Sequence, residues 1–573
     1  MRKLLRPGLG AATAVLAVLA ATTTATTPAS AADAPYDVLV FSKTAGFRHD
    51  SIAVGTQAIR DLGAANNFTV TATEDATRFT TGNLAQYEAV IFLNTTGDVL
   101  NASQQTAFES YIAAGGGYVG VHSAADTEYG WSFYGNLVGA YFRSHPAIQQ
   151  AQVRVENRAH AATAHLPQTW TRTDEWYDFQ ASARPGARIL ANLNESSYSG
   201  GVMGADHPIA WCKTYAGGRS FYTGAGHTQA SYAESAFRAH LLGGIRYAAG
   251  RTKADCRPET GYTTLYNGST TGWSQAGPGS FSNSDATLSS VGGMGLFWYS
   301  AKQFTNYSLK LDWRVAGDDN SGVFIGFPPS SDPNSAINNG YEVQIDPTDT
   351  VDKTTGAIYG FKAADIAARD AALNPAGEWN TYELLVEGER LQVFLNGVKI
   401  NDFTNTDPVR SLAGHIGIQN HGTGDDVSFR NIRIKELGGT NPPPSGERTG
   451  RITGLAGKCL DVRNGSSADG TQVQIWTCNG GAAQTWTVTP NSTIRALGKC
   501  LDVNGAGSAD GTKIQLWTCN GGGAQVWSAQ SNGTLRNPNS GKCLDVSNNS
   551  SADGQAVHLW TCHSNANQRW VLP

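Results

Sequence analysis

The chain has 573 residues and a formal net charge of −5, and only 16% of its residues are charged. It has no basic stripe, which argues against nucleic acid and anionic membranes as partners. The length indicates three or four domains rather than one. The 66 glycines and 14 tryptophans favour β architectures and sugar-binding surfaces, because aromatic faces pack on the apolar C–H faces of pyranose rings.

Residues 1–31 have the pattern of an export signal. Basic residues within Met1–Arg6 precede an apolar run at Ala11–Ala21, and Ala29–Ala31 offers a small-x-small cleavage site. That run is too short for a membrane span, and no later segment is long enough. We therefore expect a secreted, extracellular protein with no membrane partner, in which the 8 cysteines form disulfides.

Strand and helix patterns alternate after the signal. Buried-strand patterns lie at 37–41, 69–73, 89–94 and 117–122, and helical stretches lie at 51–65 and 104–114. This alternation predicts a parallel α/β sheet. Ligands of such sheets bind beyond the carboxyl ends of the strands. The loops Lys43–His49, Thr95–Asp98 and His122–Asp126 fall there, so we expect a site where they converge.

These segments resemble the trehalose-utilisation (ThuA-like) family over about 36–250. The matching motifs are KTAGFRHDSI (43–52), FLNTTGD (92–98), GVHSAADTEYGW (120–131), DEWYDF (174–179), DHPIAW (206–211) and GAGHT (224–228). The resemblance implies a flavodoxin-like fold akin to class I glutamine amidotransferases. His122 stands where those enzymes carry a nucleophilic cysteine, and no cysteine lies near it in the sequence, so thiol chemistry is not expected.

The histidines of this region are candidates for the lining of one pocket opening. They are His49, His122, His145, His207 and His227. For a polar small-molecule pocket we single out His49, Asp98, His122, Asp126 and His227. The alternatives are a metal held among the histidines and a scaffold without activity. The spacing matches no compact metal motif, so metal and cofactor stay unknown, a divalent cation being one option.

The residues Arg251–Gly261 form a short connector to a second region. Cys212 and Cys256 are the two cysteines outside the C-terminal repeats. We expect a disulfide between them, with two buried thiols as the alternative. Strand-like pieces follow at 304–313, 322–327, 341–346, 381–387, 391–395, 415–419 and 427–434, and Asn396–Gly397 is a hairpin turn signal. Many short strands separated by turns predict a β-sandwich.

Residues 261–437 resemble the 3-keto-disaccharide hydrolase domain. The matching stretches are LYNGSTTGW (265–273), NSGVFI (320–325), GYEVQID (340–346), TGAIYG (355–360), GEWNTYE (377–383), GHIGIQNHG (414–422) and FRNIRI (429–434). The resemblance implies a concanavalin-like jelly roll with a sugar-binding concave face. It also implies cleavage of glycosidic bonds in keto-sugar substrates.

The stretch Tyr341–Asp346 alternates apolar residues with Glu342, Gln344 and Asp346. Three polar side chains therefore share one strand face. Either a site or an ordinary solvated face accounts for this pattern. Glu342 and Asp346 are roughly 13 Å apart between Cα atoms, which is far for the carboxyl pair of an ordinary glycosidase.

A 3-keto sugar offers a different route that needs one base. The ketone acidifies the adjacent C–H, so removal of that proton starts elimination of the leaving group, and water adds afterwards. We predict Glu342 or His421 as the base, and Gln344, Asn320 or a cation as the group that holds the ketone oxygen. A structural hydrogen-bonding role is the alternative for Asn320 and His421.

A Pro/Gly/Ser linker at 438–448 precedes a unit of roughly 40 residues that repeats three times. Each unit carries a Cys-Leu-Asp-Val strand, an SADG turn, a Trp-Thr-Cys end and a Gln-x-Trp motif. The identical spacing predicts three local disulfides, Cys459–Cys478, Cys500–Cys519 and Cys543–Cys562.

The repeats at 449–573 resemble the ricin-type β-trefoil lectin. In that family the Gln-x-Trp tryptophans, here Trp486, Trp527 and Trp570, belong to the core. The sugar contacts implied are Asp461 with Trp476, Asp502 with Trp517, Asp545 with Trp560, and an Asn-Gln pair after the second cysteine. The third unit keeps this pair as Asn567-Gln568, whereas alanine precedes Gln484 and Gln525. We expect the third unit to bind sugar most strongly.

Together these patterns predict a multidomain, secreted carbohydrate-active hydrolase. In this interpretation the jelly roll cleaves glycosidic bonds and the lectin targets the protein to a polysaccharide or oligosaccharide. One alternative is a non-catalytic polysaccharide-binding or adhesion protein. Another places sugar chemistry in the α/β domain alone. The sequence does not name the glycan or the partner enzyme that would supply keto-sugars.

Overall fold

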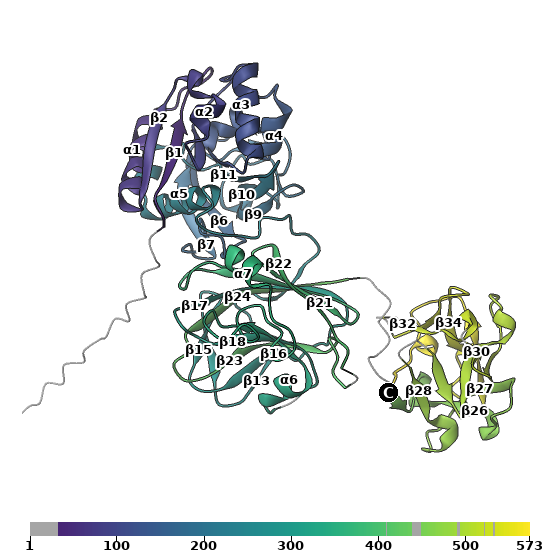
Figure 1. Cartoon of the computed structure of the whole chain (residues 1–573). Coiled ribbons are helices and arrows are strands. Elements are labelled where there is room, and N and C mark those ends of the chain that lie inside the picture. Colours follow the sequence, from purple (N-terminus) through teal and green to yellow (C-terminus); the bar gives the residue numbers. More distant parts are fainter. Residues whose placement is uncertain are drawn as a thin grey trace, which may run out of the picture.

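The computed structural model describes residues 33–437 and 448–573, apart from 330, 408, 490–492, 521 and 531–532. The expected signal peptide at 1–31 and nearly all of the expected linker at 438–448 lie outside the described residues. Three folded parts follow one another along the chain (Figure 1). In the described part of the chain, no helix is long and apolar enough to cross a membrane.

The first part is built on a nine-stranded sheet. In spatial order its strands are β2 (Phe68–Thr73), β1 (Tyr36–Phe41), β3 (Ala89–Leu93), β4 (Gly117–Val121), β11 (Gly218–Thr223), β10 (Pro208–Tyr215), β9 (Arg188–Leu193), β6 (Gln149–Val155) and β7 (Thr169–Asp174). Pairings from β2 to β11 are parallel, and those from β11 to β7 are antiparallel. The sequence predicted the parallel half alone, because no helix separates the remaining strands and the βα alternation stops there.

Helices cover both faces of this sheet. Figure 1 shows α1 (Ile52–Ala65) and α5 (Ser235–Ala248) on one side, and α3 (Ala102–Ala113) and α4 (Ser132–Val138) on the other, with α2 (Thr81–Leu84) beside α3. The buried residues Ile52, Ile59 and Leu62 recur along one face of α1, as in an amphipathic helix. Strand β3 is buried at every position, which is what a strand covered on both faces requires.

The second part is a sandwich of two antiparallel sheets, as predicted. One sheet contains β14 (Ser280–Ser284), β15 (Thr287–Val291), β24 (Val427–Glu436), β17 (Tyr307–Val315), β20 (Asn380–Glu387), β21 (Arg390–Leu395) and β22 (Val398–Thr404), with β12 (Thr263–Tyr266) beside β24. The other contains β13 (Trp273–Ala276), β16 (Gly295–Tyr299), β23 (His415–Asn420), β18 (Ser321–Phe327) and β19 (Tyr341–Ile345). Two short helices, α6 (Asn334–Asn339) and α7 (Ile366–Ala372), accompany them. Asn396 and Gly397 both have positive φ, of 48° and 88°, as the predicted hairpin turn between β21 and β22 requires.

The third part is the predicted trefoil. Its strands are β25 (Arg448–Gly450), β26 (Cys459–Val462), β27 (Thr471–Trp476), β28 (Trp486–Val488), β29 (Ile494–Ala496), β30 (Lys499–Val503), β31 (Ile514–Trp517), β32 (Ser528–Ala529), β33 (Leu535–Asn537), β34 (Lys542–Val546) and β35 (Gln555–Trp560). Trp486, Trp527 and Trp570 lie in one core, and each indole N–H donates to a leucine carbonyl. The disulfides Cys459–Cys478, Cys500–Cys519 and Cys543–Cys562 are present.

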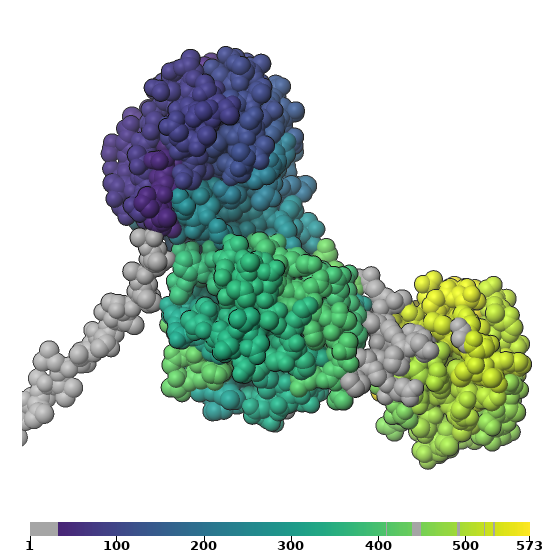
Figure 2. All heavy atoms as spheres, in the orientation of Figure 1, coloured from purple at the N-terminus to yellow at the C-terminus, as the bar shows by residue number. Residues whose placement is uncertain are grey.

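The connector Arg251–Gly261 is held tightly between the first two parts. Cys256 is disulfide-bonded to Cys212 of β10, which is the expected pair. Lys310 of β17 donates to Asp255 over 2.9 Å. The space-filling view shows the α/β and sandwich domains in direct contact (Figure 2). The connector is therefore part of an interface.

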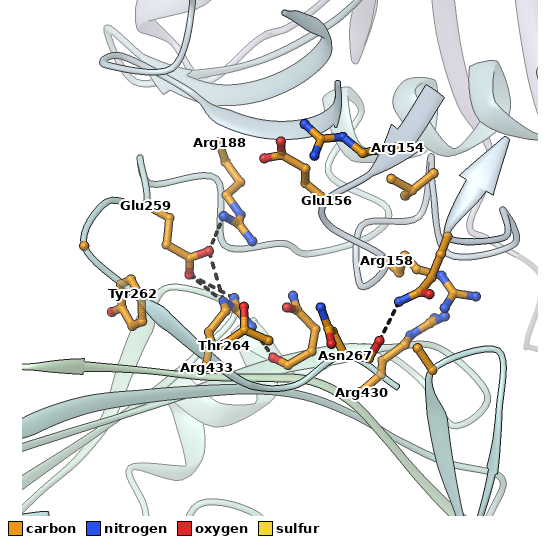
Figure 3. A pocket seen from close by; sticks show the side chains of 15 residues that line it. Arg154, Glu156, Arg158, Arg188, Glu259, Tyr262, Thr264, Asn267, Arg430 and Arg433 are labelled. Carbon is orange, nitrogen blue, oxygen red and sulfur yellow. Dashed lines mark hydrogen bonds and ion pairs between the residues drawn. The ribbon is translucent and has the colours of Figure 1, made fainter. Parts of the chain in front are cut away.

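A charged network continues this interface. Glu259 of the connector is almost fully buried and pairs with Arg188 of β9 and Arg433 of β24, so one carboxylate joins both domains (Figure 3). A pocket of about 430 Å³ opens beside it. Its charged lining comprises Arg154, Glu156, Arg158, Arg188, Glu259, Arg430 and Arg433. Removing one partner from a buried ion pair costs about 3–5 kcal/mol, so Glu259 fixes the two domains relative to each other.

Candidate functional sites

The first candidate site lies on the face of β19 that is turned away from the main sandwich core. Val343 and Ile345 point into that core, so Glu342 and Gln344 share the opposite face. Both are buried, at 4% and 1% exposure. An ordinary solvated face, the alternative left open by the sequence, does not describe these residues.

Glu342 carries a carboxyl group in a desolvated environment. Its Oε1 has no hydrogen-bond partner among the described residues. Burial disfavours the charged form and raises the pKa of Glu342 to about 8. A Cβ added to Gly322 of the neighbouring strand would overlap this carboxyl group. Glycine at 322 thus leaves the space in which the Glu342 side chain crosses β18.

Three further polar groups on this face also lack partners among the described residues. The Oε1 atoms of Gln344 and Gln419 are buried and have no hydrogen-bond partner within the described chain, and the same holds for Nε1 of Trp298. Gln419 follows Ile418, which faces the main core, so its side chain points to the same side as Glu342. Gln419 and Trp298 were not predicted, although Gln419 lies within the GHIGIQNHG stretch. Buried polar atoms without partners mark a face that is completed by a polar ligand or by water.

The predicted residues Asn320 and His421 do not lie with Glu342. Asn320 Nδ2 donates to Asp346 over 3.0 Å, and its backbone N–H donates to Asp425 over 2.9 Å. His421 Nδ1 lies 3.1 Å from the other Asp425 oxygen. Glu342 pairs in register with Phe324, and Asn320 is four residues away from Phe324, roughly 13 Å along the strand. The structure therefore corrects the expectation of one four-residue site, because Asn320 and His421 belong to a separate network at the strand ends.

The second candidate site lies at the carboxyl edge of the α/β sheet. His49 follows β1, His122 follows β4, and His227 follows β11. Together with Glu175, which follows β7, they bring four ligand-type atoms within 4.8 Å of one another. The three imidazole centroids are each 5.0 Å apart. His49, His122 and His227 therefore meet as predicted. Glu175 was not predicted as a site residue, although it lies within the DEWYDF motif.

Backbone geometry places these side chains. His122 has a positive φ of 50° at the sharp turn after β4, and its Nδ1 lies 2.8 Å from the Gly224 carbonyl oxygen. The buried Asp174 accepts the backbone N–H groups of Gly226 and His227, over 2.8 and 3.2 Å. These contacts fix the loop that presents His227.

The electrostatic environment of this cluster favours the neutral imidazole of His49 and the ionised carboxylate of Glu175. Burial, together with the neighbouring His122 and His227, lowers the pKa of His49 to about 3. Burial alone would raise the pKa of Glu175, but the adjacent His122 and His227 rings hold it well below its ordinary value. His145, 43% exposed, lies 3.0 Å from Glu175 at the rim.

Two predicted pocket residues lie apart from this cluster. Asp98 is exposed and lines a different hollow with Lys43 and Asp75, so it is not one of the four converging groups. Asp126 is half-buried and accepts a hydrogen bond of 2.7 Å from Tyr129. Burial raises the pKa of Asp126. It stands beside the cluster without being one of the four converging groups.

The third candidate site occurs once in each trefoil repeat. Trp476, Trp517 and Trp560 are each 40% exposed, which leaves an aromatic face available to a sugar ring. Beside them, Asp461, Asp502 and Asp545 are buried with their carboxylates held by neighbouring amides. The three pairs therefore have the same layout.

The glutamines of the Gln-x-Trp motifs support the aspartates. Gln484, Gln525 and Gln568 are at most 2% exposed. Each donates to the aspartate of its repeat and accepts a backbone N–H. This geometry makes the three glutamines supports for the aspartates, and their role as sugar contacts stays a prediction.

The third repeat has one additional hydrogen-bond partner for its aspartate, Asn567, because His558 takes the place that Gln474 and Gln515 hold in the other repeats. His558 Nε2 and Asn567 Nδ2 lie 2.9 and 2.8 Å from the Asp545 carboxylate. The Oδ1 atom of Asn567 is buried without a partner among the described residues.

Three family models match the chain in sequence order. They are described as trehalose utilisation (ThuA), residues 37–248, as a 3-keto-alpha-glucoside-1,2-lyase-like domain, residues 261–435, and as a ricin-type beta-trefoil lectin domain, residues 448–570. The chain combines a ThuA-like, a lyase-like and a ricin-type lectin domain. The three-domain resemblance predicted from the motifs is thereby confirmed.

Curated proteins match over short stretches. Ribosome-inactivating protein PMRIPt of Polygonatum multiflorum is 46% identical over 52 residues, 9% of each chain. Beta-galactoside-specific lectin 2 of Viscum album is 28% identical over 134 residues, 21% of this chain and 23% of the lectin. The chain thus spans less than a quarter of the length of these relatives.

Solved structures match single domains. A protein described as thua-like, from Bacteroides uniformis, is 24% identical and covers 39% of this chain and 94% of its own, with a TM-score of 0.34. A protein described as a candidate glycosyl hydrolase, from Parabacteroides distasonis, is 24% identical and covers 31% of this chain and 99% of its own, with a TM-score of 0.26.

Proposed function

We propose that this protein is a carbohydrate-active enzyme whose sandwich domain cleaves the glycosidic bond of 3-keto-glycosides. The observation that carries the proposal is the Glu342 carboxyl group, which is buried, has no hydrogen-bond partner within the described chain and has a pKa raised to about 8. A base with a pKa near the working pH is suited to removing a carbon-bound proton. The match to a 3-keto-alpha-glucoside-1,2-lyase-like family supports this substrate class.

The chemistry is an elimination followed by hydration. The Glu342 carboxylate takes the proton from C2 of the sugar, which the C3 ketone acidifies, and the electron pair forms the C1–C2 double bond as the C1–oxygen bond breaks. The leaving oxygen takes up a proton. Water then adds across the double bond, so that the overall reaction is hydrolysis. The amides of Gln344 and Gln419 are suited to hold the ketone oxygen as charge develops on it.

In the same proposal the trefoil domain keeps the enzyme on its glycan. Exposed tryptophans beside buried aspartates repeat three times, and the domain matches the ricin-type lectin family. We also propose that the protein is exported. All 8 cysteines are accounted for by four disulfides, which form and persist in oxidising compartments.

The test is turnover of a 3-keto-glucoside in deuterated water by the full chain. The wild type should release the sugar with one deuterium at C2, because solvent replaces the proton removed there. Glu342→Gln should reduce turnover by about 10²–10⁴-fold. Glu387→Gln is the matched control, since Glu387 is exposed at the end of β20, and it should behave as the wild type.

Three results would count against the proposal. Release without deuterium would indicate direct hydrolysis. Unchanged turnover in Glu342→Gln would remove this residue from the mechanism. No release by the wild type would favour the non-catalytic binding protein.

A further inference from the structure

The histidine cluster of the α/β domain brings together more hydrogen-bond acceptors than it has protons to share. The Gly224 carbonyl only accepts, so Nδ1 of His122 carries a proton, and in the neutral imidazole Nε2 then presents a lone pair. That Nε2 lies 3.4 Å from Glu175 Oε2 and 3.1 Å from His227 Nδ1. The same Glu175 oxygen is 3.1 Å from His227 Nδ1. One proton on His227 cannot satisfy all of these atoms, whereas a cation at their centre can.

The distances suit a transition-metal ion. Metal–nitrogen bonds of about 2.0–2.1 Å place neighbouring ligands about 3.3 Å apart in a tetrahedral site and about 3.0 Å apart in an octahedral one. The three separations among His122 Nε2, His227 Nδ1 and Glu175 Oε2 lie between 3.1 and 3.4 Å, and a His49 nitrogen lies within 4.8 Å of these atoms. The ring planes of His49 stand at 88° and 86° to those of His122 and His227, so the imidazoles approach one centre from different directions.

Outer contacts orient the ligands in the way that metal sites require. The Nδ1–H of His122 donates to the Gly224 carbonyl oxygen, and Nδ1 of His49 lies 3.3 Å from Ser123 Oγ. Such contacts fix the tautomer and the direction of the metal-facing nitrogen. The rim is partly open, since the His227 side chain is 20% exposed. Phe47, 68% exposed, lies against His49, so a ligand can reach the centre beside an aromatic surface.

Two other groups of ligand-type residues occur in the described chain, and each contains a single imidazole. His160 lies beside Cys212 and Cys256, but these cysteines are joined in a disulfide. His207 contacts Glu195 through Nδ1 and the Tyr177 carbonyl through Nε2, each over 2.8 Å. This group therefore offers one imidazole with the carboxylates of Asp178 and Glu195.

We propose that His49, His122, His227 and Glu175 bind one divalent transition-metal ion. A set of three imidazoles and one carboxylate suits zinc, iron(II), cobalt or manganese, whereas calcium and magnesium prefer oxygen ligands. The site is distinct from the sandwich face that carries Glu342. It gives the α/β domain a Lewis-acid centre of its own.

The experiment uses the untagged full chain, treated with chelator and then dialysed. Cobalt(II) is titrated while the visible absorption and the bound metal are measured, and magnesium is titrated in parallel. We expect one cobalt per chain with a nitrogen-ligand spectrum, and no comparable binding of magnesium. Glu175→Gln and His227→Gln should each weaken cobalt binding by about a hundredfold or more, because each removes a ligand.

The control is Glu195→Gln, which alters the carboxylate beside His207 and should bind cobalt as the wild type does. Circular dichroism of each chelator-treated variant checks that it is folded. His227 lies at the rim, so its variant tests the site even where Glu175→Gln fails to fold. The proposal is overturned if the wild type binds no transition metal, if magnesium binds equally well, or if folded Glu175→Gln or His227→Gln chains keep wild-type affinity.

Discussion

The histidine cluster of the α/β domain and the Glu342 face of the sandwich are both incomplete in hydrogen bonding, but in opposite ways. In the cluster, His122 Nε2, His227 Nδ1 and Glu175 Oε2 lie 3.1–3.4 Å from one another. On the sandwich face, Glu342 lies opposite Phe324, which belongs to an apolar cluster on that side of the sheet. Ligand atoms that face one another in this way favour a bound cation. A single buried carboxyl group favours its protonated form. The comparison separates metal chemistry from proton-transfer chemistry within one chain.

The largest loss of activity in this comparison is expected for substitutions close to Glu342. Gln344→Leu should lower kcat/KM on a 3-keto-glucoside by about a hundredfold, because it removes a group that stabilises charge on the ketone oxygen. His421→Ala should change kcat/KM by less than about threefold, since His421 lies at the far strand end. The measurement is steady-state kinetics of both variants at one pH.

The same two variants test whether the Glu342 face and the strand-end network are separate sites. Equal losses in His421→Ala and Gln344→Leu would show that the strand-end network of Asn320, Asp425 and His421 takes part in the reaction. Circular dichroism and the melting temperature of each variant exclude a folding defect. Chelator should leave the kinetics of the wild type unchanged, because the proposed metal lies in the other domain.

A smaller effect is expected in the trefoil. Asp545→Ala should weaken polysaccharide binding about fivefold more than Asp461→Ala does, since the third repeat adds Asn567 and one hydrogen bond is worth about 1 kcal/mol. Sedimentation of the full chain with insoluble polysaccharide measures this difference. A greater loss in Asp461→Ala would reverse the ranking of the repeats.

Features that depend on period and spacing were predictable from the sequence. Alternation placed Glu342 and Gln344 on one face, and equal spacing within the repeats gave Cys459–Cys478 and its two counterparts. Strand ends brought His122 and His227 together, because parallel strands share an edge. These inferences need only local geometry.

Features that depend on contacts between distant segments were not predictable. The burial of Glu342 arises from an apolar cluster on the outer side of its sheet, to which Phe324 and Trp298 belong. Glu175 reaches the histidines from the antiparallel half of the α/β sheet, which lacks the alternation with helices. Asp98 follows β3 at the same edge of the sheet, but it lines a separate hollow with Lys43 and Asp75. Sequence position alone contains none of these packing relations.

The most direct test of the central claim is the pH dependence of kcat/KM for a 3-keto-glucoside. The carboxylate of Glu342 is the active base, and burial raises its pKa to about 8, so the active fraction grows with pH up to that value. We predict that kcat/KM rises about tenfold per pH unit from pH 5 and levels off near pH 8. Glu342→Gln should lose this rise together with most of the activity. A profile that is flat or falls between pH 6 and 8 in the wild type would contradict Glu342 as the base.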